Sequence, residues 1–444
     1  MNSHMNRNTV FLDGKLQNLL KATALTTMIA LMPFASQADN PDSKHNHATG
    51  LGHASKLGHA TGSELEVKRL NQTGKGMPSI KGPFPDTFNM TLLGQLTNAE
   101  LGVTRLTNTG AAFLSDIWGW TAPAIGEENP HEYAIVGTSS GVAFVRITDP
   151  SNPEFLGIVP TTDTSTIRNF WWDIKTYNNR AYWITEVNNA GVASFDLTLL
   201  KDMGQVTAGT AISQGVKRYH GNGYLRAHNI SINEATGFAY LTGASKNDPA
   251  DPAFTDNGVI ILDLKGEEPV EVAQINDIDS HDAQVVIYHG PDLNYVGKEI
   301  AIIFNGSDLE VGIYDVTDKT DIVELSVTNY AGASYAHQGW LTEDHGYMLM
   351  GDEEDELFGI SDPKNPDLPD TARTYIWDLT DLKNPFVNGT FDSDAAAIDH
   401  NLFVKGNRIY QANYTSGIRV LEFVDISKGK LKEVAHMDTC RTII

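Results

Sequence analysis

Cysteine is almost absent from this chain: its 444 residues contain only Cys440. A single cysteine excludes an internal disulfide and every cysteine-based metal or redox motif, and its place as the fifth residue from the end argues against nucleophilic cysteine chemistry. The folded chain must therefore be stabilised by its hydrophobic core or by bound ions. Apolar residues make up 41% of the sequence and aromatic residues 9%, which is enough for a globular core and excludes disorder along the whole chain.

Basic side chains are scarce relative to acidic ones. Lysine and arginine number 32 against 56 aspartates and glutamates, which gives a formal net charge of -24. This excess of negative charge repels a phosphate backbone, and no basic patch in the sequence offsets it. Nucleic acids are therefore excluded as partners, and cations are the natural small partners.

Long hydrophobic runs are missing as well. The only strongly apolar stretch, residues 22–34, is about 13 residues long, whereas a membrane-spanning helix needs roughly 20. It follows three basic residues and ends before the small residues Ser36 and Ala38, a pattern typical of a secretory signal peptide over residues 1–38. An uncleaved anchor is the alternative. We expect a secreted or periplasmic protein with no transmembrane helix in the mature chain.

Residues 39–89 are rich in Gly, Ser, Thr, Asn, Lys and His and poor in large apolar residues. Such a segment cannot bury enough apolar surface to fold alone, so we interpret it as a disordered linker. Four histidines offer a second interpretation, a weak tract for gathering metal ions. They are His45, His47, His53 and His59.

Residues 90–444 repeat a pattern of two short β-branched and aromatic segments joined by a turn. The second segment usually ends in an Asp-hydrophobic-Thr-Asp type of stop. Six copies cover residues 132–149, 181–198, 238–264, 299–318, 347–381 and 408–423. Each copy therefore predicts a pair of antiparallel strands.

One more strand is expected before each pair, as the first strand of the repeat, and another after it, as at residues 154–159, 270–275 and 386–391. The first strand of each repeat begins at an ionisable residue that recurs every 53 to 63 residues. Four antiparallel strands per repeat predict an all-β fold, a β-propeller of six four-stranded blades. Either residues 90–96 close a six-bladed ring, or a seventh blade is incomplete.

The first strand of a propeller blade lines the central channel, so the recurring ionisable residues would form a ring. Converging imidazoles and carboxylates can hold one divalent ion, such as Zn²⁺, Mn²⁺ or Ca²⁺. They can equally well hydrogen-bond to each other, to the backbone and to channel water. The ring consists of Asp116, Asp173, His228, His281, His337 and His400.

Two further sets of residues are candidates for ligand binding. Tryptophans near the ring would pack between blades, or would form an apolar platform at the channel mouth: Trp118, Trp120, Trp172 and Trp340. Acidic turns after the second strands contain Glu186, Asp352 and Glu353. Their carboxylates could bind Ca²⁺, but no EF-hand loop is present, and a solvated acidic surface is the favoured interpretation.

Several long motifs resemble the choice-of-anchor B family, exported bacterial proteins built from LVIVD-type β-propeller repeats. The resemblance spans residues 92–438 and includes the segments 116–120, 132–137, 226–230, 281–292, 337–344 and 399–406. It implies a propeller placed at the cell surface or secreted, and implies no particular activity. Family members usually continue with another Trp-containing strand set and a surface anchor, whereas this chain ends at Ile444. Surface attachment is therefore in doubt.

No nucleophile elbow, phosphate-binding loop, His-Glu-x-x-His or dinucleotide motif is present, so no catalytic residue is assigned. We therefore expect a noncatalytic exported propeller that binds an extracellular ligand or protein. The alternative is a metal-dependent lyase or hydrolase of an extracellular polymer such as a polysaccharide, with the histidines holding the metal and Asp116 or Asp173 acting as base. A purely structural adhesion module is a third possibility.

Overall fold

The computed structural model describes residues 87–103, 114–123, 130–161, 171–187, 189–247, 254, 256–356 and 368–438. The predicted signal peptide, the four histidines of the linker and Cys440 lie outside these described residues. Within them, no helix is long and apolar enough to cross a membrane.

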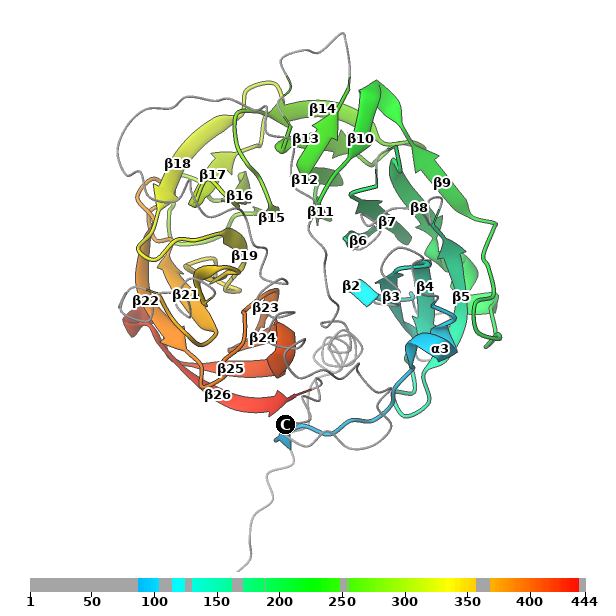
Figure 1. The fold of residues 1–444 in the computed structure, drawn as a ribbon. Coiled ribbons are helices and arrows are strands. Elements are labelled where there is room, and N and C mark those ends of the chain that lie inside the picture. Colours follow the sequence, from blue (N-terminus) through cyan, green and yellow to red (C-terminus); the bar gives the residue numbers. More distant parts are fainter. Residues whose placement is uncertain are drawn as a thin grey trace, which may run out of the picture.

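Six antiparallel sheets surround a central axis, so the predicted six-bladed β-propeller is confirmed (Figure 1). Blade 1 consists of β2 (Leu114–Thr121), β3 (Glu132–Thr138), β4 (Gly141–Arg146) and β5 (Glu154–Pro160). Blade 2 consists of β6 (Trp172–Tyr177), β7 (Arg180–Thr185), β8 (Val192–Asp196) and β9 (Val216–Tyr219). Blade 3 consists of β11 (Asn229–Asn233), β12 (Phe238–Lys246), β13 (Gly258–Asp263) and β14 (Val270–Ile275).

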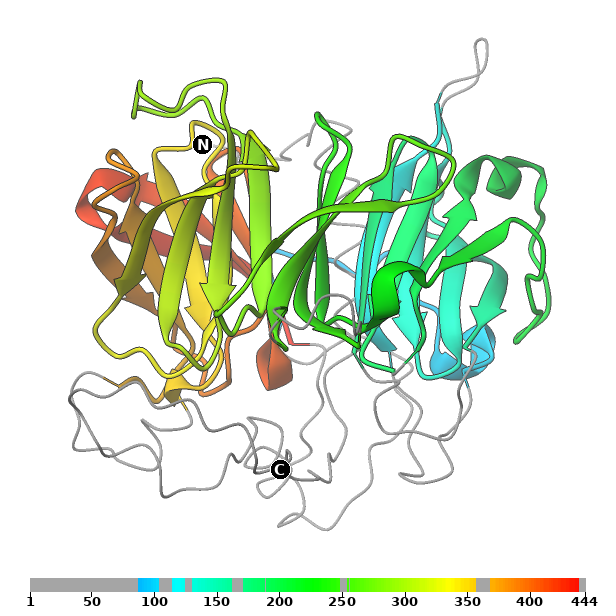
Figure 2. The same ribbon diagram turned by 90° about the horizontal axis from the view of Figure 1, so that it is seen from above.

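The second half of the chain repeats the arrangement. Blade 4 consists of β15 (Asp282–Ile287), β16 (Glu299–Asn305), β17 (Glu310–Asp315) and β18 (Val323–Asn329). Blade 5 consists of β19 (Ala336–Leu341), β20 (Tyr347–Asp352), β21 (Arg373–Asp378) and β22 (Phe386–Asp392). Blade 6 consists of β23 (Leu402–Lys405), β24 (Arg408–Asn413), β25 (Gly417–Asp425) and β26 (Lys430–Met437). In each blade the first strand lies nearest the axis, and the sheets stand side by side around it (Figures 1 and 2).

Short additions decorate this frame. A three-residue strand, β10 (Tyr224–Arg226), pairs with the end of β12 and widens blade 3. The short 3-10 helices are η2 (Leu197–Asp202), η3 (Gly221–Gly223), η4 (Tyr414–Ser416) and η5 (Ile426–Lys428).

The hydrophobic core is divided into layers between consecutive blades. Phe144 of blade 1 stacks on Phe195 of blade 2, with ring centroids 4.6 Å apart. Further clusters lie between blades 2 and 3, 3 and 4, 4 and 5, and 5 and 6. The β-branched and aromatic residues that identify the strands therefore also fill these layers, because both faces of blades 2 to 5 are covered by a neighbouring blade.

Residues 87–103 close the ring between blade 6 and blade 1. β1 (Thr87–Phe88) pairs with the outer strand β26, with Thr87 opposite Met437. The predicted closing strand at residues 90–96 is therefore wrong: Met90 and Leu92 lie beyond β1 and pack beside Ile418 instead.

The same segment then docks on blade 1 through α3 (Asn98–Leu101). Thr97 caps this helix, and its backbone and side chain form a capping box with Glu100. Leu101 is fully buried in the core of blade 1. One continuous segment thus joins the outer edge of blade 6 to blade 1 by hydrogen bonds at one end and a buried leucine at the other.

Replacing Leu101 with alanine should destabilise the protein by about 2–5 kcal/mol, because it removes a fully buried side chain from this docking contact. Leu93→Ala is the matched control, since Leu93 is 56% exposed and should change stability by less than about 0.5 kcal/mol. Equilibrium urea unfolding of both variants measures the difference. Equal midpoints would show that the segment does not stabilise the closed ring.

Candidate functional site

Polar side chains on the innermost strands of blades 1, 2, 4 and 5 bind the backbone of the following blade. Asp116 Oδ2 accepts a hydrogen bond from the backbone N–H of Ile174 at 2.8 Å, and Asp173 Oδ2 accepts one from that of Ile230 at 2.7 Å. Glutamines do the same further round the ring: Gln284 accepts from Leu341 N–H at 2.7 Å, and Gln338 from Leu402 N–H at 2.9 Å. The two ring aspartates thus have structural partners in the neighbouring blade.

One side of the channel contains three carboxyl groups around a single lysine: Asp173 is buried, and Asp116 and Asp282 are half-buried. The Lys175 ammonium contacts Asp173 and lies 4.6 Å from the centroid of the Trp118 ring. Burial and the charge of Asp173 raise the pKa of Asp116 well above its usual range and that of Asp282 to about 7. Burial lowers the pKa of Lys175, but Asp173 and its neighbours outweigh this effect and raise it. The positive charge of Lys175 therefore offsets the negative charge of this group of acids.

The other side of the channel is a row of four imidazoles from consecutive blades. Ring centroids are 4.3 Å apart for His228 and His281, 4.4 Å for His281 and His337, and 4.5 Å for His337 and His400. His281 and His337 are buried, whereas the His400 side chain is 36% exposed. The four predicted histidines therefore do lie together.

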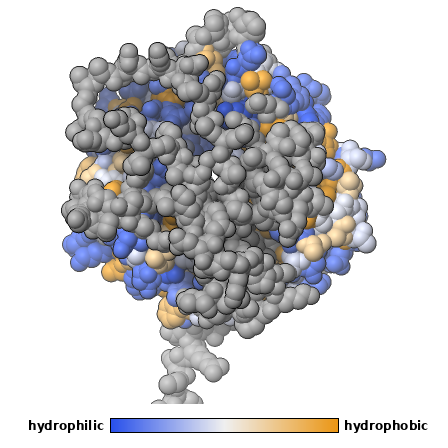
Figure 3. Space-filling view, in the orientation of Figure 1, coloured by the Kyte–Doolittle hydropathy of each residue, from blue (hydrophilic) through white to orange (hydrophobic). Residues whose placement is uncertain are grey.

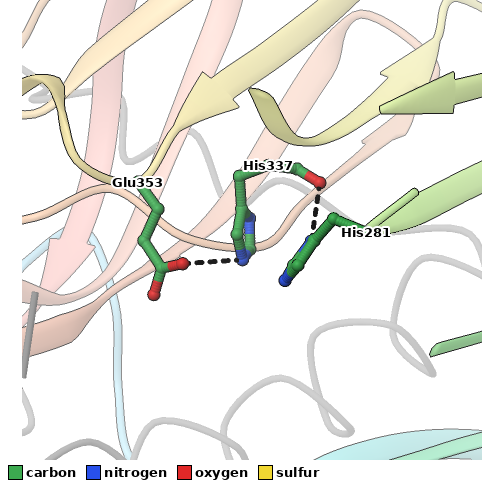
Figure 4. A group of neighbouring side chains, drawn as sticks. All are labelled: His281, His337 and Glu353. Atoms are coloured by element: carbon green, nitrogen blue, oxygen red, sulfur yellow. Dashed lines mark hydrogen bonds and ion pairs between the residues drawn. The ribbon is translucent and has the colours of Figure 1, made fainter. Parts of the chain in front are cut away.

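Glu353 completes the row from the turn after β20 (Figure 4). Its Oε2 lies 3.3 Å from Nε2 of His337, and its Oε1 lies 3.9 Å from Nε2 of His400 and accepts a hydrogen bond from the Tyr414 hydroxyl. One ligand atom each from His281, His337 and Glu353 lie within 4.8 Å of one another. These three groups could hold a metal ion.

The hydrogen bond made by His281 suits metal binding. His281 Nδ1 lies 3.0 Å from the backbone oxygen of His337, so Nδ1 carries the proton and Nε2 is left as the electron-pair donor. A hydrogen bond of this kind commonly orients metal-binding imidazoles. The buried Nδ1 of His337 has no hydrogen-bond partner among the described residues.

The electrostatics keep the two central imidazoles neutral. Burial, together with repulsion from the neighbouring imidazoles, lowers the pKa of His281 and of His337 well below the usual range. Burial also acts against protonation of His228, but the hydrogen bond and charge of Glu186 outweigh it and raise the pKa of His228. Glu186 Oε1 lies 2.5 Å from His228 Nδ1. The row thus places two imidazoles of lowered pKa beside one whose pKa is raised.

The predicted tryptophans pack between blades. Trp118 donates its indole N–H to Thr176, Trp120 packs on Tyr133, and Trp172 is buried among residues of blades 1 and 2. Trp340 lies 4.9 Å from Phe403 across the interface of blades 5 and 6. Their observed contacts are those of core residues.

The acidic turn after β20 differs from the favoured expectation. Asp352 and Asp355 are both fully buried, so the interpretation as a solvated acidic surface is wrong for them. Asp352 accepts hydrogen bonds from the Tyr330 hydroxyl and from the backbone N–H groups of Ser334 and Tyr335. Its carboxylate therefore fixes the approach to β19, which carries His337.

Sequence reasoning missed several neighbours of the site. Lys175 and Asp282 each lie within two residues of a predicted ring position, which is a usable signal. Tyr335 lies 5.1 Å from His281, two residues before His337. Tyr414 comes from a 3-10 turn with no recognisable pattern, and only the fold brings it to Glu353.

The chain matches no protein-family model and no curated protein sequence. Solved structures similar to it include a protein from Lactobacillus plantarum (12% identity, 74% of this chain and 83% of that one, TM-score 0.42). Another is a functionally unknown protein from Desulfotomaculum acetoxidans (11% identity, 67% of this chain and 77% of that one, TM-score 0.42). A third is a hypothetical selenium-binding protein from Sulfolobus tokodaii (10% identity, 70% of this chain and 79% of that one, TM-score 0.42). Similarity at this level carries no functional argument.

Lys175→Met should destabilise the protein by about 3 kcal/mol, because it leaves the buried Asp173 and the half-buried Asp116 and Asp282 without their cation. Lys432→Met is the control: Lys432 pairs with Glu422 at 3.0 Å but is 55% exposed, and its loss should change stability by less than about 1 kcal/mol. Adding Asp173→Asn to Lys175→Met should recover part of the loss. Equal denaturant midpoints for the two single variants would contradict the role given to Lys175.

Proposed function

We propose that this chain is an exported, noncatalytic β-propeller that binds a divalent transition metal in its channel and a ligand or protein partner over that channel. The observation that carries the proposal is the convergence of two neutral imidazoles and a carboxylate, from His281, His337 and Glu353. Such a mixed nitrogen and oxygen set suits Zn²⁺ or Mn²⁺ better than Ca²⁺, which prefers oxygen ligands alone.

The sequence supports the exported part of this proposal. The apolar stretch at residues 22–34 and the small residues before Asp39 have the pattern of a secretory signal. The motifs in blades 1 and 3 to 6 resemble those of the choice-of-anchor B family, to which we assign the chain on this basis. A secreted or periplasmic location follows from the same two observations.

The surface is compatible with binding. The described part of the face in Figure 3 is mostly hydrophilic, with hydrophobic residues scattered around the rim. A partner would therefore be recognised mainly by polar contacts, and the net charge of -24 favours one that carries positive charge or brings a bridging cation.

A second candidate function is a metal-dependent lyase or hydrolase of an extracellular polymer. It is favoured by one observation, the His228–Glu186 pair, which places a protonatable imidazole 4.3 Å from the His281 ring. A bound metal would supply Lewis-acid chemistry, and His228 could then give a proton to a leaving group.

Metal analysis tests the proposal, using a chain from which residues 45–59 have been deleted to remove the histidine tract. We expect about one Zn²⁺ or Mn²⁺ per chain, and at least about 100-fold weaker binding in His281→Ala and in His337→Ala. His289→Ala is the control, since His289 is exposed and bonds the Glu343 carbonyl away from the channel. Binding that is absent from the parent chain, or unchanged in both channel variants, would contradict the proposal.

The two functions are separated by an activity screen of the metal-loaded chain against polysaccharides and other polymers. Turnover that disappears in Glu186→Gln while the metal remains bound would establish the enzymatic alternative. Absence of turnover with the metal in place supports the noncatalytic role.

A further inference from the structure

A second group of acidic side chains lies between blades 5 and 6, apart from the row of imidazoles. Asp355 and Glu356 follow β20, and Asp399 precedes β23. Their exposed fractions are 0%, 0% and 1%. One carboxylate oxygen of each lies within 4.8 Å of one from each of the other two.

Hydrogen bonds satisfy only two of the six carboxylate oxygens. Asp355 Oδ2 accepts from the Tyr375 hydroxyl at 2.8 Å, and Glu356 Oε1 accepts from the backbone N–H groups of Arg373 at 3.1 Å and Asp399 at 3.3 Å. The remaining four oxygens, Oδ1 of Asp355, Oε2 of Glu356 and both of Asp399, have no hydrogen-bond partner in the described part of the chain. Burying an acceptor without a partner destabilises the folded protein, so these four oxygens need a proton or a cation.

Asp399 supports a ligand independently of the other two acids. It comes from the next blade, it is almost fully buried, and neither of its oxygens meets a donor in the described residues. Its carboxylate rests against Gly351 of β20, where an added Cβ would lie 1.9 Å from Oδ2. Only glycine at position 351 leaves room for the carboxylate in this place.

Within the described residues, no basic side chain neutralises the group. Burial and the charge of Asp352 raise the pKa of Asp355 and outweigh the charge of Arg373, which lowers it. The Arg373 guanidinium pairs with Asp392, with Nε–Oδ1 at 2.6 Å and Nη2–Oδ2 at 3.0 Å, and therefore does not compensate for all three acids. The three carboxylates therefore require either protons or a bound cation.

We propose that Asp355, Glu356 and Asp399 bind a calcium ion that clips blade 5 to blade 6. The donor set is oxygen only, which suits a hard cation and disfavours Zn²⁺. Magnesium usually keeps several of its waters, and a site whose carboxylates are fully buried offers little room for them. A divalent ion would also reduce the charge of three close carboxylates.

The three acids of the proposed calcium site are close in sequence to residues of the channel. Asp355 and Glu356 follow Glu353 by two and three residues, and Asp399 immediately precedes His400. Calcium in this place would fix both the turn that carries Glu353 and the approach to β23. It would thereby hold the carboxylate and the imidazole of His400 near the proposed transition-metal ligands, although calcium binding itself does not depend on that proposal.

Calorimetric titration of the metal-free full chain with CaCl₂ at pH 7.5 tests the site, together with thermal unfolding in chelator and in calcium. We expect about one Ca²⁺ per chain, with Kd between about 10 μM and 1 mM, and a Tm that rises by about 5 °C at one hundred times Kd. Asp399→Asn should abolish both effects. In chelator this variant should unfold at or above the parent Tm, because it removes an unpaired buried charge.

Two controls separate this site from others. Asp394→Asn removes an acidic side chain that is 91% exposed and five residues away, and should keep the calcium effects. His281→Ala should also keep them, so that failure of the channel proposal and failure of this one can be distinguished. If Asp399→Asn does not fold, Glu356→Gln replaces it. A parent chain that binds no calcium, or an Asp399→Asn variant that gains as much Tm from calcium as the parent, would overturn the proposal and favour shared protons.

Discussion

The central constraint in this propeller is that the innermost strands of blades 1, 2, 4 and 5 satisfy backbone N–H groups of the following blade at the channel wall. Asp116, Asp173, Gln284 and Gln338 do so by accepting hydrogen bonds from the backbone of the following blade. Unpaired N–H groups at this depth would cost about 1–3 kcal/mol each. The bridges therefore set how closely the strands approach the axis, and with it the spacing of the channel side chains.

That spacing explains why the channel is divided by charge. Three acids on one side share Lys175, whereas on the other side burial and mutual repulsion oppose protonation of His281 and His337. Glu353 reaches the histidine side from a turn rather than from a first strand. A metal ion at this point would be held by two blades and a turn that is itself anchored by buried carboxylates.

The sequence predicts the fold well because strand patterns and repeat length report burial, and burial is what builds the blades. It does not predict that the six ring positions form two sets. Asp116 and Asp173 accept a backbone hydrogen bond from the next blade as Gln338 does, and Gln338 follows His337 by one residue. Successive residues of a strand face opposite ways, so the two aspartates turn to the neighbouring backbone while the histidines turn to one another. The acidic turn was misjudged for a related reason, because local composition cannot show that Tyr330 and Tyr375 cover it. The closing strand lay a few residues from its predicted place, since a strand of two residues is too short to show an alternating pattern.

The measurement that tests this account most directly is a crystal structure of the protein grown with Zn²⁺, with anomalous data collected at the zinc edge. The account predicts one strong peak in the channel, about 2.0–2.2 Å from an imidazole nitrogen of His281, from one of His337 and from an oxygen of Glu353. No peak in the channel, or zinc bound only at surface histidines such as His289, would contradict it.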